Sequence, residues 1–302
     1  MTKINKKILV TGGNGFIGRN LINNLKKTDA EIHNLGRQKI SNISVDNYFS
    51  IDITSKSDVD TLSESYDIIY HCAGSPNVPY SVSNPINDFE VNALGALNIL
   101  EYARRTRSKK FILLSTVSVY GKLNDLPLNE TSIKKPISPY GASKLSAENY
   151  CHVYNSCYGM DTRIARMYNV YGPGLERLFI ADLINKIKSS DGYINIIGDG
   201  KQIRDYIYIT DLINALIIIA NKGLSGNDYD ISSGSPIELY QIIEMVLKIM
   251  NQKEIKINYS NVRNLGDIKE WYGDPEKISK LGFKQKVDLY DGLKKTIKFD
   301  KI

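Results

Sequence analysis

The chain opens with a short apolar run that leads directly into a glycine-rich loop. Residues 8–10 are Ile-Leu-Val, glycines follow at Gly12, Gly15 and Gly18, and apolar side chains recur at helical spacing over 20–25. Glycines at such positions permit a tight turn, close approach of the backbone to a pyrophosphate and close packing of a helix on a strand. The sequence therefore predicts a strand, a phosphate-binding turn and a helix, which is how many parallel α/β folds begin.

Strand-like and helical segments continue to alternate through the first half of the chain. Such alternation is typical of a parallel, doubly wound sheet with helices on both faces. After residue 169 the pattern loosens, and glycine-rich turns separate the remaining segments. Strands are expected near 31–35, 67–71, 110–115 and 161–167, and helices near 15–26, 56–64, 88–106, 139–158, 178–190, 210–221 and 236–251.

The change in pattern divides the chain into two expected regions. Residues 1–168, joined by about 205–235, are expected to form a nucleotide-binding α/β domain. Residues 169–204 and about 236–302 are expected to form a smaller C-terminal α/β lobe that binds the substrate. A chain of 302 residues is long enough to bury a core in each region.

Charge and cysteine content narrow the class of protein. The 39 basic and 33 acidic residues give a formal net charge of +6 and are scattered, which favours a solvated surface over a nucleic-acid interface. Cys72, Cys151 and Cys157 lack the spacing of a metal site, so reduced thiols in a cytoplasmic protein are expected, with no bound metal. No run of about 18 apolar residues predicts a membrane-spanning helix.

Tyr140 and Lys144 stand four residues apart in the segment Pro-Tyr-Gly-Ala-Ser-Lys. Two residues at this spacing share one face of a helix. A lysine ammonium beside a phenol stabilises the phenolate and lowers the tyrosine pKa from about 10. The pair therefore predicts a tyrosine that acts as a general acid and base near neutral pH.

Together, the G-x-x-G-x-x-G loop and the Tyr/Lys pair resemble the extended short-chain dehydrogenase/reductase superfamily, in its branch of nucleotide-sugar epimerases, dehydratases and reductases. Residues 115–121 resemble the S-[ST]-x-x-V-Y-G segment of that branch. The resemblance implies a Rossmann-like fold, an NAD(P) cofactor and a nucleotide-diphosphate sugar as substrate. It also implies that Tyr140, Lys144 and Thr116 are the catalytic residues.

Further segments carry the resemblance into the cofactor site. Residues 52–53 resemble a pair that lies around the adenine, and residues 71–74 resemble a segment beside the pyrophosphate. Residues 92–98 resemble the family's N-x-x-G-T-x-N helix, whose asparagine supports the active site from behind. The cofactor-binding residues that the resemblance implies are Gly12, Gly15, Phe16, Ile17, Gly18, Arg37, Asp52, Ile53, Cys72, Ala73, Asn92, Ser115, Tyr140 and Lys144.

Three other segments resemble parts of the family's substrate site. Residues 166–173 resemble L-R-x-x-N-V-Y-G-P, and residues 197–206 resemble G-D-G-x-Q-x-R-D-[YF], whose arginine would hold a nucleotide phosphate. Residues 78–85 resemble a loop that lies against the sugar in many epimerases. The substrate-binding residues implied are Pro79, Thr116, Ser118, Tyr140, Asn169, Arg204 and Trp271.

The sequence departs from the family pattern at three places. Gly36 and Arg37 stand where an NAD-binding aspartate is expected, which favours NADP by residue chemistry, although the branch's epimerases mostly use NAD; the cofactor is left as NAD(P). Residues 117–118 are Val-Ser, where dehydratases carry an Asp-Glu acid pair, so dehydration is disfavoured. Arg263 and Asn264 replace part of an Arg-Pro-Gly-Asp segment, which could weaken a phosphate clamp.

These features lead to three alternative functions. The favoured one is a nucleotide-sugar epimerase that is expected to act at C4 of a UDP-hexose: hydride passes to bound NAD(P), the keto-sugar rotates, and hydride returns to its other face. The second is an NADPH-dependent reductase of a 4-keto-6-deoxy nucleotide sugar. The third is a non-catalytic nucleotide-binding relative. A homodimer formed through the helices at 88–106 and 139–158 is also expected.

Overall fold

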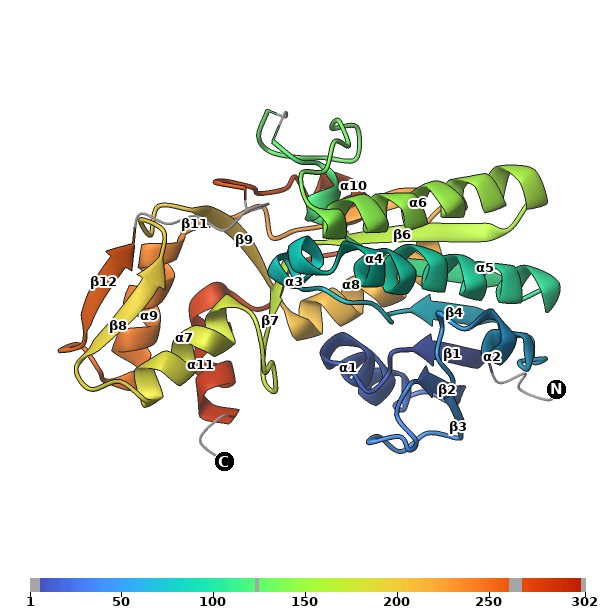
Figure 1. Cartoon of the computed structure of the whole chain (residues 1–302), viewed down its shortest axis with the longest axis horizontal. Helices are drawn as coiled ribbons and strands as arrows, with labels where there is room; N and C mark the ends of the chain where they lie inside the picture. The colour runs from blue at the N-terminus through green and yellow to red at the C-terminus, as the bar shows by residue number, and fades with distance from the viewer. Residues whose placement is uncertain (1–5, 123–124, 261–267, 300–302) are drawn as a thin grey trace.

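A seven-stranded sheet forms the centre of the computed structural model, which describes residues 6–122, 125–260 and 268–299 (Figure 1). Its strand order is β10-β6-β5-β4-β1-β2-β3, and every neighbouring pair runs parallel. This confirms the predicted doubly wound α/β class. The strands are β1 (Lys7–Thr11), β2 (Glu31–Gly36), β3 (Asn47–Ser50), β4 (Ile68–His71), β5 (Lys110–Thr116), β6 (Asp161–Met167) and β10 (Asp228–Ile231).

The order of the strands reverses between β1 and β4. From β1 the chain adds β2 and β3 on one side, then returns to place β4, β5 and β6 on the other side. Ligands of open α/β sheets bind outside the carboxyl ends of the strands at such a switch point. The fold therefore places a binding site where β1, β4 and β5 end.

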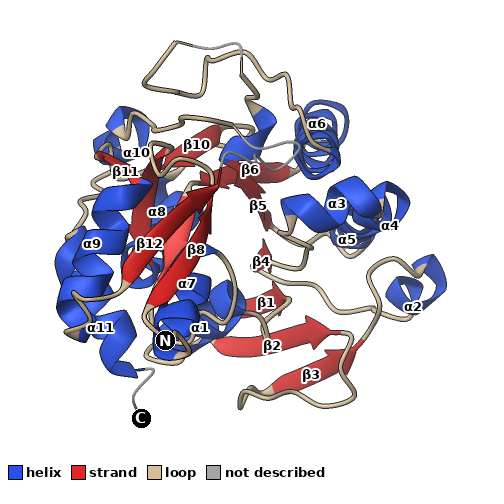
Figure 2. Ribbon diagram, turned by 60° about the vertical axis from the view of Figure 1, so that its left-hand side comes forward, coloured by secondary structure: helices blue, strands red, loops and turns tan. Residues whose placement is uncertain are grey.

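Helices cover both faces of this sheet (Figure 2). On one face α5 packs against α2 and α6, and on the other α1 packs against α8. Two separate hydrophobic clusters lie beneath these layers. None of the helices in the described ranges is long and apolar enough to cross a bilayer. The helices are α1 (Phe16–Leu25), α2 (Lys56–Asp60), α5 (Gly95–Arg105), α6 (Pro139–Tyr158) and α8 (Ile209–Lys222).

The predicted helix over 139–158 forms with those bounds, as α6, because its ends carry strong local signals. Ser138 accepts a hydrogen bond from the Gly141 amide at 3.1 Å, and Pro139 occupies the first turn, where its missing N–H costs nothing. Gly159 ends the helix in the left-handed conformation at φ 66°. These caps determine where Tyr140 and Lys144 lie relative to the sheet.

The single helix expected over 88–106 is wrong in detail. The structure has a short helix α4 (Pro85–Phe89), a π-helical turn over Glu90–Leu94, and then α5. The Gly95 amide donates to the Glu90 carbonyl five residues earlier, and a Cβ on Gly95 would lie 2.7 Å from Ile53 Cδ1. A π turn changes the backbone register without a distinctive side-chain pattern, so the periodicity did not reveal it.

Residues 78–85 do not form the expected loop. They contain the helix α3 (Val78–Ser83), followed directly by α4. Asn77 caps α3 by accepting a hydrogen bond from the Tyr80 amide at 2.8 Å, and Pro79 lies in the first turn. The Asn77 cap and Pro79 are local signals for a helix, but they span so few residues that the segment is easily interpreted as a turn.

The second half of the chain contains two small sheets that the sequence did not predict. One has the order β11-β9-β7 and the other pairs β12 with β8. Each strand is short, and several join segments far apart in the chain, so local patterns were weak. The helix expected at 236–251 begins later, at Leu239, after β11. The elements are β7 (Asn169–Tyr171), α7 (Phe179–Lys188), β8 (Tyr193–Ile197), β9 (Ile203–Tyr208), β11 (Pro236–Glu238), α9 (Leu239–Met250), β12 (Lys256–Ser260), α10 (Glu276–Lys280) and α11 (Leu289–Phe299).

Candidate active site

The glycine-rich loop packs so closely against the protein that side chains would not fit at Gly12 and Gly18. Gly12 has φ +71°, and a Cβ there would lie 2.7 Å from the Ala73 backbone; a Cβ on Gly18 would lie 2.4 Å from the Gly12 carbonyl oxygen. At Gly15 the surroundings differ, because only the Gly12 oxygen, at 3.2 Å, is within 4 Å among the described residues. The loop is therefore closed towards the protein and open at Gly15.

The N-terminus of α1 faces this opening. Gly15 is its N-cap, and the described residues provide neither a side-chain cap nor an acidic residue in its first turn. Amide groups at such a helix end are free to bind phosphate, and the helix dipole favours an anion there. The loop thus fits the pyrophosphate of a dinucleotide cofactor.

The ends of β1 and β4 are tied together beside the loop. Thr11 Oγ1 accepts a hydrogen bond from the Ala73 amide at 3.2 Å and lies 3.0 Å from His71 Nδ1. The Cys72 amide donates to the Thr11 carbonyl at 3.1 Å. These bonds place Cys72 and Ala73 beside Gly12, where the sequence expects them.

Tyr140, Lys144 and Thr116 come together at the carboxyl end of β5. Lys144 Nζ donates to the Leu114 carbonyl at 2.6 Å, and the Tyr140 hydroxyl is hydrogen-bonded to Thr116. The side chains of all three residues are buried. The structure therefore assembles the three predicted catalytic residues, whose roles remain predictions.

The predicted direction of the Tyr140 pKa shift is wrong for this structure. Burial raises the Tyr140 pKa to about 12; the Thr116 hydrogen bond opposes this effect and the nearby Asp88 carboxylate adds to it. Burial also lowers the Lys144 pKa to about 8, although the neighbouring Glu148 carboxylate opposes that change. Loss of hydration is the largest cause of the Tyr140 shift, and the Lys144 charge on which the prediction relied is not among the causes.

Acidic side chains surround the buried Arg166 guanidinium on the side of α6 that carries Glu148. The Arg166 guanidinium donates to both Glu148 carboxylate oxygens at 2.8 and 2.9 Å, and Ser115 Oγ donates to one of them at 2.5 Å. Arg166 also forms ion pairs with Asp228 and Asp230. The Ser115 side chain is therefore engaged with Glu148, and a contact of Ser115 with the cofactor stays a prediction.

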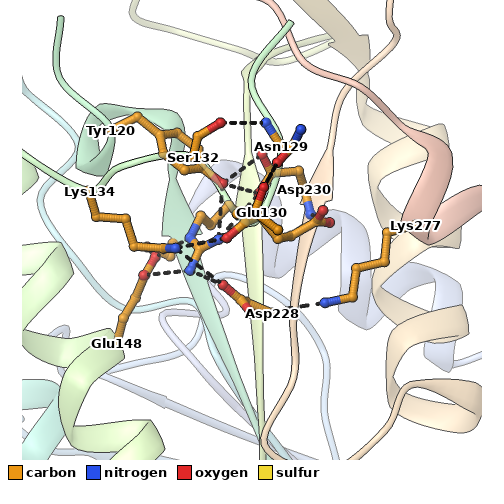
Figure 3. Close-up of polar contacts among 12 residues, drawn as sticks. Tyr120, Asn129, Glu130, Ser132, Lys134, Glu148, Asp228, Asp230 and Lys277 are labelled. Carbon is orange, nitrogen blue, oxygen red and sulfur yellow. Dashed lines mark hydrogen bonds and ion pairs between the residues drawn. The ribbon is translucent and has the colours of Figure 1, made fainter. Parts of the chain in front are cut away.

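The loop before α6 closes this charged group at the edge of the sheet (Figure 3). Glu130 accepts a hydrogen bond from the Asp230 amide at 2.8 Å, and Lys134 and Lys277 approach Asp228 from opposite sides at 3.9 and 4.0 Å. β10 is the edge strand, so Glu130 satisfies a main-chain donor that would otherwise be exposed. Burial raises the Asp230 pKa to about 7.

Three of the predicted substrate residues lie where the sheet β11-β9-β7 meets Val117–Val119, the turn that follows β5 and that we call the active-site turn. The Arg204 guanidinium lies 4.6 Å above the Trp271 ring and donates to the Lys269 carbonyl at 3.0 Å. Asn169 donates to the Asp205 carbonyl at 2.8 Å on the neighbouring strand. Trp271 packs on a cluster that includes Val117 and Val119 of the active-site turn.

Other predicted residues are placed less directly. Arg37 is exposed just after β2, and one Asp52 oxygen accepts hydrogen bonds from Thr54. Ile53 packs in the core against α5. Pro79 is exposed and Ser118 is buried beside Thr116, while Arg263 and Asn264 lie outside the described residues.

The sequence did not single out three polar side chains at α6, which carries the predicted catalytic residues Tyr140 and Lys144 and which we call the catalytic helix. Ser81 accepts a hydrogen bond from the Tyr140 amide at 3.1 Å, and Asp88 accepts one from Ser143 Oγ at 2.6 Å. Spacing along the sequence could have indicated two of them, because Ser143 lies between Tyr140 and Lys144 on α6 and Asp88 precedes Asn92 by one helical turn.

Comparison with known proteins identifies the family of the chain. The model of the NAD dependent epimerase/dehydratase family matches residues 8–232. A UDP-glucuronate 4-epimerase of Thermodesulfobacterium geofontis is 32% identical over 259 residues, which cover 84% of this chain and 79% of that protein.

Two solved structures share the whole fold. The UDP-glucose 4-epimerase of Thermotoga maritima, solved with UDP-glucose, superposes with a TM-score of 0.91 at 29% identity, covering 98% of both chains. The UDP-glucose 4-epimerase of Thermus thermophilus, solved with NAD, gives a TM-score of 0.87 at 26% identity, covering 98% of this chain and 99% of that one. The chain therefore belongs to the NAD-dependent epimerase/dehydratase family.

Proposed function

We propose that the protein is a nucleotide-sugar epimerase that oxidises a sugar carbinol and reduces the keto-sugar on its opposite face, at C4 of a UDP-hexose. The observation that carries this proposal is the meeting of Thr116, Tyr140 and Lys144 at the carboxyl end of β5, at the same edge of the sheet as the glycine loop that follows β1. The relatives that bind or act on UDP-sugars support the choice of substrate class.

Each of the predicted site residues has its own role in the proposed reaction. The glycine loop and the N-terminus of α1 would hold the cofactor's pyrophosphate. When bound, an oxidised nicotinamide supplies a hydride acceptor and a positive charge, and a positive charge beside a phenol lowers its pKa. Tyr140 would exchange a proton with the sugar hydroxyl, Thr116 would hydrogen-bond to the reacting oxygen, and Lys144 would bind the nicotinamide ribose.

The same site argues against dehydration. Elimination of water needs an acid and a base beside the sugar, and residues 117–118 offer a buried Val117 and a Ser118 that accepts a hydrogen bond from Thr116. Neither side chain can supply a carboxyl group. Among the chemistries of the family, reversible oxidation at one carbon therefore fits these residues better.

One experiment tests the epimerase directly. Purified protein is denatured, the released nucleotides are identified by mass spectrometry, and fresh protein is incubated with UDP-glucose, UDP-N-acetylglucosamine or UDP-glucuronate without added cofactor. Release of a nicotinamide dinucleotide and interconversion with the C4 epimer are expected, with Tyr140→Phe as the inactive control. Absence of interconversion for every UDP-hexose would contradict the proposal.

A reductase is the second candidate, because one observation favours it. β2 ends at Gly36 without a carboxylate, and the exposed Arg37 follows, where a guanidinium could pair with the 2′-phosphate of NADP. A reductase would consume NADPH in a one-to-one ratio with a 4-keto-6-deoxy nucleotide sugar and would not epimerise UDP-hexoses. Absorbance at the NADPH band distinguishes the two outcomes.

We also propose a homodimer formed by the exposed side of α4, the π-helical turn and α6. Large apolar side chains that lie open to solvent there would be covered by a second copy. We expect Val153→Glu to give a monomer in light scattering, whereas Leu224→Glu, an exposed leucine elsewhere, should not. The residues are Ile86, Phe89, Leu94, Tyr150, Val153 and Tyr158.

A further inference from the structure

Asp88 is a fully buried carboxylate that lies beside the catalytic helix. It belongs to α4, immediately before the π-helical turn. Asn92 Nδ2 donates to its Oδ1 at 2.9 Å, and Ser143 Oγ donates to its Oδ2 at 2.6 Å. Because both oxygens accept hydrogen bonds, the contacts are those of an ionised carboxylate. A buried charge held only by neutral donors is costly, so a compensating role is expected.

The first contact determines how the Asn92 amide is oriented. With Nδ2 directed at Asp88, Oδ1 accepts a hydrogen bond from the Ser75 amide at 2.9 Å, and Nδ2 also donates to the Ser75 carbonyl at 3.2 Å. If the amide were turned over, its oxygen would face the Asp88 carboxylate. Asp88 therefore fixes the main chain that follows β4, next to the predicted pyrophosphate site.

The second contact reaches the first turns of α6. Ser143 lies between Tyr140 and Lys144, and its hydroxyl also lies 3.0 Å from the Tyr140 carbonyl. The Tyr140 amide in turn donates to Ser81 Oγ. The π-helical turn allows one short stretch of chain to contact both the segment after β4 and the catalytic helix, which accords with the frequent occurrence of such turns at functional sites.

We propose that Asp88 is a positioning residue of this active site, whose carboxylate holds Asn92 and the first turns of α6 in one arrangement and places a negative charge beside Tyr140. Burial is the main cause that raises the Tyr140 pKa and the Asp88 charge adds to it, so Tyr140 keeps its proton until a positive charge beside it offsets both effects. Tyr140 is thereby prepared to act as a proton donor as well as a base.

The polar and titratable groups around Tyr140 and Asp88 come from β4, β5 and α6. Thr116 of β5 hydrogen-bonds to Tyr140 and lowers its pKa, whereas Asp88 raises it. Lys144 of α6 is the positive charge that acts on Asp88. The groups around Lys144 are Glu148, Cys151, Cys72 and Asp88, and His71, whose pKa burial and Lys144 lower to about 3, stays neutral.

The test uses two variants that change the Asp88–Ser143 contact in different ways. Asp88→Asn removes the charge and leaves one acceptor oxygen for the two donors Asn92 and Ser143, whereas Ser143→Ala removes the hydroxyl and leaves the charge in place. The Tyr140 resonance, labelled with ¹³C at Cζ and assigned from the Tyr140→Phe spectrum, is titrated in protein without substrate. Exchange of the Ser75 amide with deuterium reports the position of the chain after β4.

We expect Asp88→Asn to lower the Tyr140 titration midpoint by roughly 0.5 to 1 pH unit and to speed exchange at Ser75 by about tenfold. Ser143→Ala should leave both values close to those of the unmodified protein. Equal effects of the two variants, or no effect of Asp88→Asn on either measurement, would overturn the inference. If Asp88→Asn does not fold, Asp88→Ser is measured in its place with the same expected outcomes.

A kinetic measurement, which rests on the proposed function, extends the test. The acid limb of the pH–kcat profile should move to lower pH in Asp88→Asn and stay in place in Ser143→Ala, because the limb follows protonation of Tyr140. A protein that shows the titration and exchange effects but epimerises no UDP-hexose contradicts the proposed function alone. Epimerase activity with no titration or exchange effect contradicts this inference alone.

Discussion

Two buried carboxylates lie at the catalytic helix, Glu148 on the helix itself and Asp88 on the neighbouring α4, and the two have different partners. Glu148 pairs with the Arg166 guanidinium through two hydrogen bonds, whereas Asp88 meets only an amide and a hydroxyl. Both carboxylates act on Lys144, whereas of the two Asp88 alone raises the Tyr140 pKa, and loss of the cation from a buried ion pair is strongly destabilising. The Glu148 side is therefore expected to stabilise the fold and the Asp88 side to act on Tyr140.

The largest effect should come from the catalytic side. Tyr140→Phe removes the proton-exchanging hydroxyl, so kcat should fall by roughly 10³- to 10⁴-fold, measured as interconversion of the UDP-hexose epimers. Only one buried hydrogen bond is lost, so the free energy of unfolding should fall by about 1 kcal/mol. A variant that retains normal kcat would contradict the assigned role of Tyr140.

The opposite pattern is expected on the Glu148 side. Arg166→Met leaves Glu148 and Asp228 without their main cation, and the free energy of unfolding should fall by about 3–5 kcal/mol in urea titrations. The matched control is Arg166→Met combined with Glu148→Gln, which removes both charges and should recover part of that loss. If Arg166→Met lowered kcat and left stability unchanged, the contrast between the two sides would be wrong.

A smaller effect on stability is expected from Lys144, whose pKa both Glu148 and Asp88 influence. Its pKa of about 8 in the fold lies below that of an unfolded lysine, so the unfolded chain binds more protons between about pH 8 and 10.5. Stability contributed by this residue therefore rises with pH. We expect Lys144→Met to be more stable than the unmodified protein at pH 7, with the difference shrinking by about 2 kcal/mol at pH 9.5.

The control for this measurement is Lys253→Met, which replaces an exposed lysine. Its difference in unfolding free energy from the unmodified protein should be the same at both pH values. A difference for Lys144→Met that grew as the pH rose would show that the ammonium stabilises the fold, contrary to the burial argument.

The smallest effect lies outside the catalytic helix, at Arg37. Arg37→Ser should weaken NADP binding by about tenfold relative to NAD, measured as the two Kd values by calorimetry. Lys39→Ser, which removes an exposed positive charge two residues further on, should change the ratio less. Equal weakening of both cofactors would indicate that Arg37 stacks on the adenine.

Short-range patterns were sufficient for the framework of the site. The bounds of α6 and β6 could be predicted because caps and alternating segments lie within a few residues of one another. The glycine loop could be interpreted because each glycine meets a local steric limit. Tyr140 and Lys144 could be paired because helical spacing alone places them on one face.

What depends on distant residues could not be predicted in this way. Asp88 contacts Ser143 across 55 positions, and β8 pairs with a strand more than 50 residues away. The direction of the Tyr140 pKa shift followed from burial, which is a property of the packed molecule and not of the neighbouring sequence. Residue type and spacing thus determined which groups are predicted to be catalytic, while the tertiary fold determined their charge states, because hydration and electric field depend on everything packed around a group.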